Sequence, residues 1–205
     1  MAVATARLQV RLLGVPQFEW EQHQVAPASR KGLALLALLA GHESGLQRDE
    51  IAEYLWEPGK LASVRQALYE LRKQPGAESW LVEDGTLVRL YAETDLGAFL
   101  AALNEGHSAA ALTHYGGDFL TGLHDVAVPA FEEWLTFERE RLRALYLSAP
   151  VADAKRLEAA GEFGAARLRV QDALRIDSLD ERLYRTGMRL SYIQGDVEGA
   201  KEFLK

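Results

Sequence analysis

The sequence lacks several features that would define other classes of protein. It contains no cysteine, which excludes disulfide bonds, thiolate nucleophiles and cysteine-based zinc sites. Its longest apolar run, residues 32–41, is too short to span a bilayer, which needs about 20 residues, and indicates a buried core helix. Residues 1–14 lack the apolar core of a secretory signal. These absences fit a soluble protein of a reducing compartment, and we expect a cytoplasmic location with no membrane partner.

Basic charge is also scarce. The net charge is −7, and neither half of the chain is basic: residues 1–95 carry −3 and residues 96–205 carry −4. A nucleic-acid-binding protein normally shows a basic footprint, so DNA binding would require a local positive patch. Residues 60–73 supply one, with four Lys or Arg against a single Glu, a local charge of +3.

The first part of the chain combines short strands with helices. Residues 7–13 alternate apolar and polar side chains, which predicts a half-buried strand, and residues 17–26 follow as a short hairpin. Pro58 and Gly59 indicate a turn between two helices. The three helices that we expect here cover residues 32–40, 48–56 and 61–74.

A second hairpin is predicted over residues 79–91. Two apolar runs flank Asp84 and Gly85, and a type I′ turn at this pair would need positive φ at both central residues. Both faces of the hairpin carry apolar side chains, so the pattern leaves open which face packs inward. Strands, three helices and a hairpin, in this order, are typical of a winged helix-turn-helix domain.

From Asp95 onward the pattern is entirely helical and contains a repeat. Gly161 and Gly195 are 34 residues apart, as are Ala166 and Ala200, and this is the tetratricopeptide period. Residues 178–181 match a capping box, with Ser178 as N-cap and Glu181 at N3. The second repeat is short, so either the final helix ends the fold or the chain is a fragment of a longer one.

The predicted fold class is mainly α with a small β component. We expect a winged helix-turn-helix domain over residues 1–94, followed by an all-α, tetratricopeptide-like helical domain over residues 95–205.

Five segments, in order, give the chain a specific family resemblance. They are RLLG with RKGLALLALLA, QRDEIAEYLW, SVRQALYELRK, HYGGDFLTGL (114–123) and FEEWLTFERERLR (131–143). From about Arg7 to Leu204 the chain resembles the streptomycete-type antibiotic regulatory proteins (SARP family), which join an OmpR-like winged helix to a bacterial transcriptional activator domain. The resemblance implies transcription activation, binding to direct repeats in double-stranded DNA and contact with RNA polymerase, and it allows a homodimer on DNA.

Three residues depart from the family pattern. Gln47 stands where the family usually has Ser or a similar capping residue, so a more weakly capped second helix is expected. Pro150 interrupts a helix that is typically continuous, and should kink or break it. Ser178 stands where the family often has Pro.

The predicted recognition helix, residues 61–74, separates into two faces. Val64, Ala67, Leu68 and Leu71 form the buried arc. We expect Arg65 and Gln66 to read base edges in the major groove, because Arg matches guanine and Gln matches adenine. Phosphate contacts, which position without specifying, are expected from Lys60, Ser63, Tyr69, Arg72 and Lys73. On the following hairpin, Arg89 could reach the backbone or the minor groove.

Other kinds of site find little support in the sequence. The five histidines show no metal-ligand spacing, no nucleophile motif is present, and we expect no enzyme activity, no cofactor and no metal. Residues 137–143 alternate acid and base, which favours a salt-bridged, solvated helix face. No aromatic stacking platform supports binding of single-stranded nucleic acid or RNA.

Two hypotheses of function remain. The first is a sequence-specific DNA-binding transcriptional regulator, an activator by resemblance, whose helical domain contacts other proteins. The second is a protein-interaction or scaffold module of a larger regulator, whose winged helix no longer binds DNA. The acidic N-terminal half motivates the second, and an amphipathic helix with four basic residues is, taken alone, more often an ordinary solvated surface.

Overall fold

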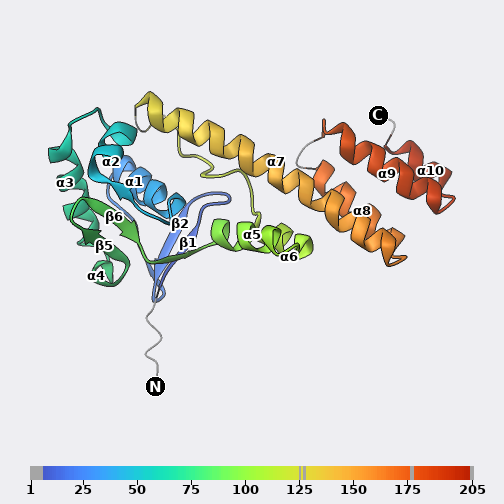
Figure 1. Cartoon of the computed structure of the whole chain (residues 1–205), viewed down its shortest axis with the longest axis horizontal. Helices are drawn as coiled ribbons and strands as arrows, with labels where there is room; N and C mark the ends of the chain where they lie inside the picture. The colour runs from blue at the N-terminus through green and yellow to red at the C-terminus, as the bar shows by residue number, and fades with distance from the viewer. Residues whose placement is uncertain (1–6, 125, 127, 176–177, 204–205) are drawn as a thin grey trace, which may run out of the picture. The chain divides into compact units, whose positions relative to one another are not determined.

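A computed structural model describes residues 7–124, 126, 128–175 and 178–203 (Figure 1). The chain forms two compact units. Unit 1 comprises Met1–Ala98 and His114–Glu140, and unit 2 comprises Phe99–Thr113 and Arg141–Lys205. Residues 1–6 and 204–205 of the predicted domains lie outside the described residues. The compact units interleave along the chain, whereas the sequence predicts two consecutive domains; the boundary at residue 94 stays a prediction.

Unit 1 begins with a four-stranded sheet. Strands β1 (Leu8–Arg11), β2 (Gln17–Trp20) and β3 (His23–Gln24) form an antiparallel meander, which confirms the predicted strand and hairpin. Strand β7 (Ala92–Thr94) joins the other edge of β1 in parallel, with Leu8 opposite Ala92. Burial alternates along β1, where Leu8 and Val10 face the core and the intervening residues face solvent.

Three helices complete the predicted helix-turn-helix core. They are α1 (Arg30–Gly41), α2 (Arg48–Leu55) and α3 (Leu61–Leu71). Helix α1 is almost wholly buried, as its apolar sequence predicts, and Ser29 caps it by accepting a hydrogen bond from the Gly32 N–H. Helix α3 ends three residues earlier than expected, because Pro75 disfavours helical geometry at Gln74.

The wing is a three-stranded sheet in the order β4-β6-β5 (Figure 1). It consists of β4 (Leu46–Gln47), β5 (Leu81–Asp84) and β6 (Leu87–Leu90), and the short helix α4 (Ala77–Trp80) leads into it. Asp84 pairs with Leu87, so the two turn residues are Gly85 and Thr86 rather than Asp84 and Gly85. Of these two turn residues, Gly85 has a positive φ (61°) and Thr86 does not. A type I′ turn needs positive φ at both, so the predicted turn type is wrong.

Residues from the predicted activator domain pack within unit 1. Asp95 accepts hydrogen bonds from the N–H groups of Leu12 (2.7 Å) and Leu13 (3.0 Å) at the end of β1. The carbonyl of Leu12 in turn accepts from the Leu120 N–H at 2.8 Å. Arg139 donates to the carbonyls of Phe119 (2.8 Å) and Leu120 (2.7 Å). Interpreting residues 137–143 as a solvated, salt-bridged face is therefore wrong for Arg139, which binds backbone.

The remaining elements are helical, and most of their residues belong to unit 2. They are α5 (Asp95–Asn104), α6 (Ser108–His114), α7 (Pro129–Ala159), α8 (Phe163–Leu174), α9 (Glu181–Ile193) and α10 (Val197–Lys201). Gly161 (φ 79°) and Gly195 (φ 71°) lie in the turns before α8 and α10, as the repeat predicts. The mainly α fold, with a winged helix-turn-helix and a tetratricopeptide-like helical part, is confirmed.

Two predictions about the helical part are wrong. Helix α9 begins after Asp180, whose carboxylate accepts from the Arg182 N–H, so Ser178 is not its N-cap and Glu181 lies at N1. Of the kink or break expected at Pro150, the break does not occur, because helix α7 runs from Pro129 to Ala159 with Pro150 inside it. None of the described helices is long and apolar enough to cross a membrane.

Candidate nucleic-acid interface

Helix α3 presents one buried face and one exposed face. Val64, Leu68 and Leu71 are at most 1% exposed and anchor the helix in the core. Arg65 and Gln66 are exposed side by side on the opposite face. An Arg and a Gln on the exposed face of a helix offer a guanidinium fork and an amide. These are the two groups that best match purine edges in the major groove.

Three of the four basic residues predicted in this helix are already paired with carboxylates. Lys60 lies 3.8 Å from Glu57, and Lys73 lies 2.9 Å from Glu70. Arg72, the residue after the last helical residue, is paired with Glu83 on β5. Among the described residues, Arg65 alone of the four makes no ion pair. The local charge of +3 in the sequence is therefore largely offset in the fold.

Glu70 organises the outer face of α3. Its carboxylate accepts a hydrogen bond from Gln66 Nε2 at 3.0 Å and two from Lys73 Nζ at 2.9 Å. The Lys73 ammonium also lies 4.3 Å from the centre of the Tyr69 ring, whose side chain is half exposed. The hydrogen bond to Glu70 raises the pKa of Lys73, so the ammonium stays charged across the physiological range. These contacts pre-order Gln66 and Lys73 on one surface.

A carboxylate of the wing, that of Glu83, forms an ion pair with the end of α3. Glu83, whose side chain is 15% exposed, pairs with Arg72 and also accepts a hydrogen bond from Arg48 Nη2 at 2.5 Å. Arg89, on β6, is half buried and lies 5.6 Å from the Tyr91 ring. No hydrogen bond or ion pair joins Arg89 to α3 among the described residues. Ser63 is half buried near the start of α3.

Sequence reasoning missed part of this surface. A hollow of about 930 Å³ lies between the start of α1 and α3, lined by Lys31, Trp56, Gln66 and Lys73 among others. The Lys31 ammonium lies 5.4 Å from the Trp56 ring. The spacing of Gln66, Glu70 and Lys73 at i, i+4 and i+7 is visible in the sequence and would have predicted their contact. No sequence spacing predicts the contact between Lys31 and Trp56, because the two residues are distant in the chain and meet only in the folded structure.

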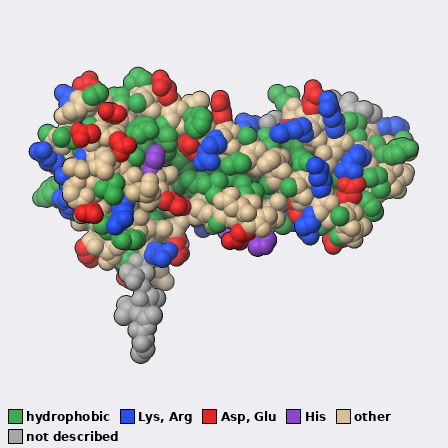
Figure 2. Space-filling model, viewed as in Figure 1, with side chains coloured by type: hydrophobic (Ala, Val, Ile, Leu, Met, Phe, Trp, Pro, Cys, Tyr) green, Lys and Arg blue, Asp and Glu red, His purple; other side chains and the backbone are tan. Residues whose placement is uncertain are grey.

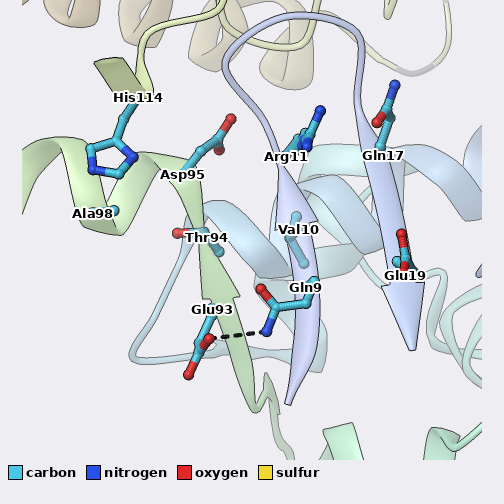
Figure 3. Close-up of a pocket in the computed structure, with 10 residues that line it drawn as sticks. All are labelled: Gln9, Val10, Arg11, Gln17, Glu19, Glu93, Thr94, Asp95, Ala98 and His114. Atoms are coloured by element: carbon cyan, nitrogen blue, oxygen red, sulfur yellow. Dashed lines mark hydrogen bonds between the residues drawn. The ribbon is translucent and has the colours of Figure 1, made fainter. Parts of the chain in front are cut away.

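A second hollow, of about 490 Å³, lies on the polar face of the four-stranded sheet (Figure 3). Gln9 Nε2 donates to Glu93 at 3.0 Å across the β1–β7 pair. Figure 3 shows Arg11 toward the upper end of β1 and Asp95 where the chain leaves β7 and enters α5. Asp95 is committed to the backbone of β1, as described above. The hollow lies over β1, β2 and β7, and its lining carries charges of both signs.

The visible surface of unit 1 mixes both signs of charge. In Figure 2, Lys and Arg side chains are interspersed with Asp and Glu side chains over this unit, and basic side chains occur at the edge where Figure 1 places α3. This pattern agrees with the ion pairs of Lys60, Arg72 and Lys73.

Comparison with known proteins identifies the class of this protein. The family model described as the bacterial transcriptional activator domain matches residues 92–202, more than half of the chain. The chain belongs to this family. This membership confirms the resemblance to the streptomycete-type antibiotic regulatory proteins seen in the sequence.

Two individual proteins show how far the similarity extends. An uncharacterized 47.3 kDa protein from the thcA 5′ region of Rhodococcus erythropolis is 33% identical over 123 residues, which cover 59% of this chain and 27% of that protein. The structure of Mycobacterium tuberculosis EmbR in complex with a low-affinity phosphopeptide matches with a TM-score of 0.72 and 23% identity. That match covers 97% of this chain and 58% of EmbR, and at this identity it supports the fold. The chain thus spans about a quarter of the first relative and just over half of the second.

Proposed function

We propose that this chain is a sequence-specific DNA-binding regulator that activates transcription. Helix α3 enters the major groove, Arg65 and Gln66 contact base edges, and Lys60, Ser63, Tyr69, Arg72 and Lys73 contact phosphates. Arg89 on the wing reaches the adjacent backbone or minor groove. The winged helix would occupy residues 1–94 and the activator domain residues 95–205.

The exposure of Arg65 beside Gln66 carries this proposal. No described carboxylate pairs with Arg65, so its guanidinium donors are available to a base, while Gln66 is held in place by Glu70. A bidentate Arg–guanine contact is worth about 1–3 kcal/mol of discrimination against another base. The remaining basic side chains would exchange their carboxylate partners for phosphates on binding.

The helical domain would contact other proteins. Membership of the activator-domain family supports contact with RNA polymerase, binding to direct repeats and assembly of a homodimer on DNA as parts of the same proposal.

The competing function is a protein-interaction module whose winged helix no longer binds DNA. The pairing of Lys60, Arg72 and Lys73 with Glu57, Glu83 and Glu70 favours it, because each pair removes one basic group from the phosphate footprint. This alternative predicts that the face of α3 has no measurable affinity for duplex DNA.

Selection of bound fragments from a genomic DNA library, at two salt concentrations, separates the two functions. We expect enrichment of one sequence motif, arranged as direct repeats, and affinity that falls steeply as salt rises because phosphate contacts release counterions. Circular dichroism of the same sample controls for folding. Folded protein that enriches no motif at either salt concentration would overturn the DNA-binding proposal and favour the interaction module.

A further inference from the structure

A hollow in unit 1, apart from the α3 surface, combines aromatic rings with carboxylates. It has a volume of about 670 Å³ and lies between α2, the residue that follows α1 and the beginning of α7. Its ring-bearing residues are His42, Tyr54, Trp134 and Phe137. None of them belongs to the proposed DNA face, so the inference below does not rest on the proposed function.

The rings form a fixed wall. The His42 ring stacks on Trp134, with centroids 5.3 Å apart and planes 28° apart, and Tyr54 meets Trp134 edge-on at 6.2 Å. Behind them, Phe131 and Phe119 pack against Trp134 at 5.4 and 5.6 Å. His42 is held further by a 2.7 Å hydrogen bond between Nδ1 and the Leu38 carbonyl. Phe137, by contrast, is 63% exposed and forms an open apolar rim.

The remaining polar lining is acidic. Four glutamates face the hollow, and none of the described residues that line it is Lys or Arg; they are Glu50, Glu53, Glu133 and Glu138. Glu50 already accepts the Gln47 N–H at 2.6 Å. Glu53 and Glu133 are exposed and make no ion pair among the described residues. An aromatic wall whose acidic and basic lining residues, among those described, are four glutamates and no Lys or Arg is complementary to a large, weakly hydrated cation.

We propose that this hollow binds an arginine side chain presented by a partner protein. A guanidinium is planar, stacks on aromatic faces and donates to carboxylates, so it satisfies both the ring wall and Glu53 or Glu133 at once. The hollow is open at Phe137 and larger than one side chain, which suits a protein segment crossing the surface. Small-molecule sites instead bury most of their ligand.

Three labelled nine-residue peptides, identical except for a central Arg, Lys or citrulline, test this inference on the full chain. Citrulline has the shape of arginine without the charge. Binding is followed by the fluorescence anisotropy of the peptide and by the amide and indole signals of the isotope-labelled protein. We expect the Arg peptide to shift the Trp134 indole signal saturably, the Lys peptide to bind more weakly, and the citrulline peptide to leave the signal unchanged.

Matched variants assign the binding to the hollow. We expect Phe137→Ala to weaken binding about threefold to fivefold, in line with an exposed cation–π contact. The double variant Glu53→Gln/Glu133→Gln removes both candidate carboxylates and should weaken binding about threefold to fivefold, in line with the loss of one exposed ion pair. Val15→Ala and Glu78→Gln, which alter exposed residues of the same unit away from the hollow, should leave it unchanged.

Several results would overturn the inference. Equal binding of the Arg and citrulline peptides would remove the charge requirement. Unchanged affinity in both the Phe137 and the double Glu variant would place binding elsewhere. Free arginine amide that binds as tightly as the Arg peptide would make the site a small-cation site instead of a protein-docking surface.

Discussion

Arg72, at the end of α3, and Glu83, on strand β5, form an ion pair that joins α3 to the wing. The same carboxylate accepts a hydrogen bond from Arg48 at the start of α2. One glutamate thus links three elements of the winged helix. It also places a negative charge beside a residue proposed to contact phosphate, so its removal should affect stability and DNA binding in opposite directions.

Glu83→Gln should lower the free energy of unfolding by about 1–2 kcal/mol, because it weakens two charge-assisted hydrogen bonds. It should also raise the affinity for non-specific duplex DNA. Arg72 becomes available to a phosphate, and each additional phosphate contact steepens the salt slope by about 0.9. Urea unfolding and fluorescence anisotropy at several salt concentrations measure the two effects. Glu78→Gln, on the neighbouring helix α4, is the control, and a lower affinity in Glu83→Gln would contradict the prediction.

Arg65→Ala and Lys73→Ala should weaken DNA binding in different ways. Arg65→Ala should lower affinity for the selected motif by about 1–3 kcal/mol and leave non-specific binding nearly unchanged, because base contacts specify sequence. Lys73→Ala should weaken all sequences alike and reduce the salt slope by about one. Anisotropy with the selected motif and a scrambled duplex distinguishes them. Lys201→Ala, in α10, should change neither quantity, and an equal loss of specificity in both test variants would refute the assigned roles.

Gly76 connects α3 to the wing at a position that only glycine fits. Its φ is 68°, and an added Cβ would lie 2.1 Å from the indole nitrogen of Trp20. Gly76→Ala should therefore destabilise unit 1 by about 2–5 kcal/mol, since backbone strain costs about 1–2 and overpacking about 1–3. Gly59→Ala is the matched control: its φ is 80°, but no atom lies within 4 Å of the new Cβ.

Urea unfolding of both glycine variants tests this comparison. Gly59→Ala should lose only the backbone contribution, about 1–2 kcal/mol. Equal losses at the two positions would show that the Trp20 contact adds nothing.

The sequence predicts those elements whose pattern extends over several residues. Periodicity identified β1 and the helices α2 and α3, because each buries one face at regular spacing, whereas α1 followed from its continuous apolar run and the turn glycines from the 34-residue repeat. Strands β4 and β7 escaped prediction because two or three residues are too few to show a period. They become strands only when a neighbouring strand supplies their hydrogen-bond partners.

The position of the candidate site could be predicted from the sequence, but not all of the ion pairs that offset its positive charge. The exposed face of α3 follows from helical spacing, and so does the contact between Glu70 and Lys73, three residues apart. The pairing of Arg72 with Glu83 depends on the wing folding back beside α3, which no local pattern encodes. For the same reason, the aromatic hollow around Trp134 could not be predicted, since its rings come from three separate helical regions.

Asp196 should make the end of the helical part sensitive to acid. Its carboxylate caps α10 by accepting the Gly199 N–H at 2.8 Å and pairs with Arg167. These two interactions hold the pKa of Asp196 below its ordinary value of 3.8. Because the charged form is favoured in the folded state, the stabilisation is complete above pH 3.8 and is lost as the pH falls from there through the lower folded-state pKa.

Asp196→Asn isolates this effect. Asparagine keeps the capping acceptor but cannot ionise, so the variant should be less stable than the parent chain near neutral pH and should lose less stability on acidification. Hydrogen bonds from Arg189 and Arg182 likewise lower the pKa values of Glu158 and Asp180, respectively. The parent chain and the Asp196→Asn variant will therefore both lose stability in acid. The difference between them is therefore the quantity to measure, by thermal unfolding and by hydrogen exchange of the Gly199 amide. An identical loss of stability in the two proteins would mean that the charge of Asp196 does not stabilise the fold, and that its role is limited to the neutral cap of α10.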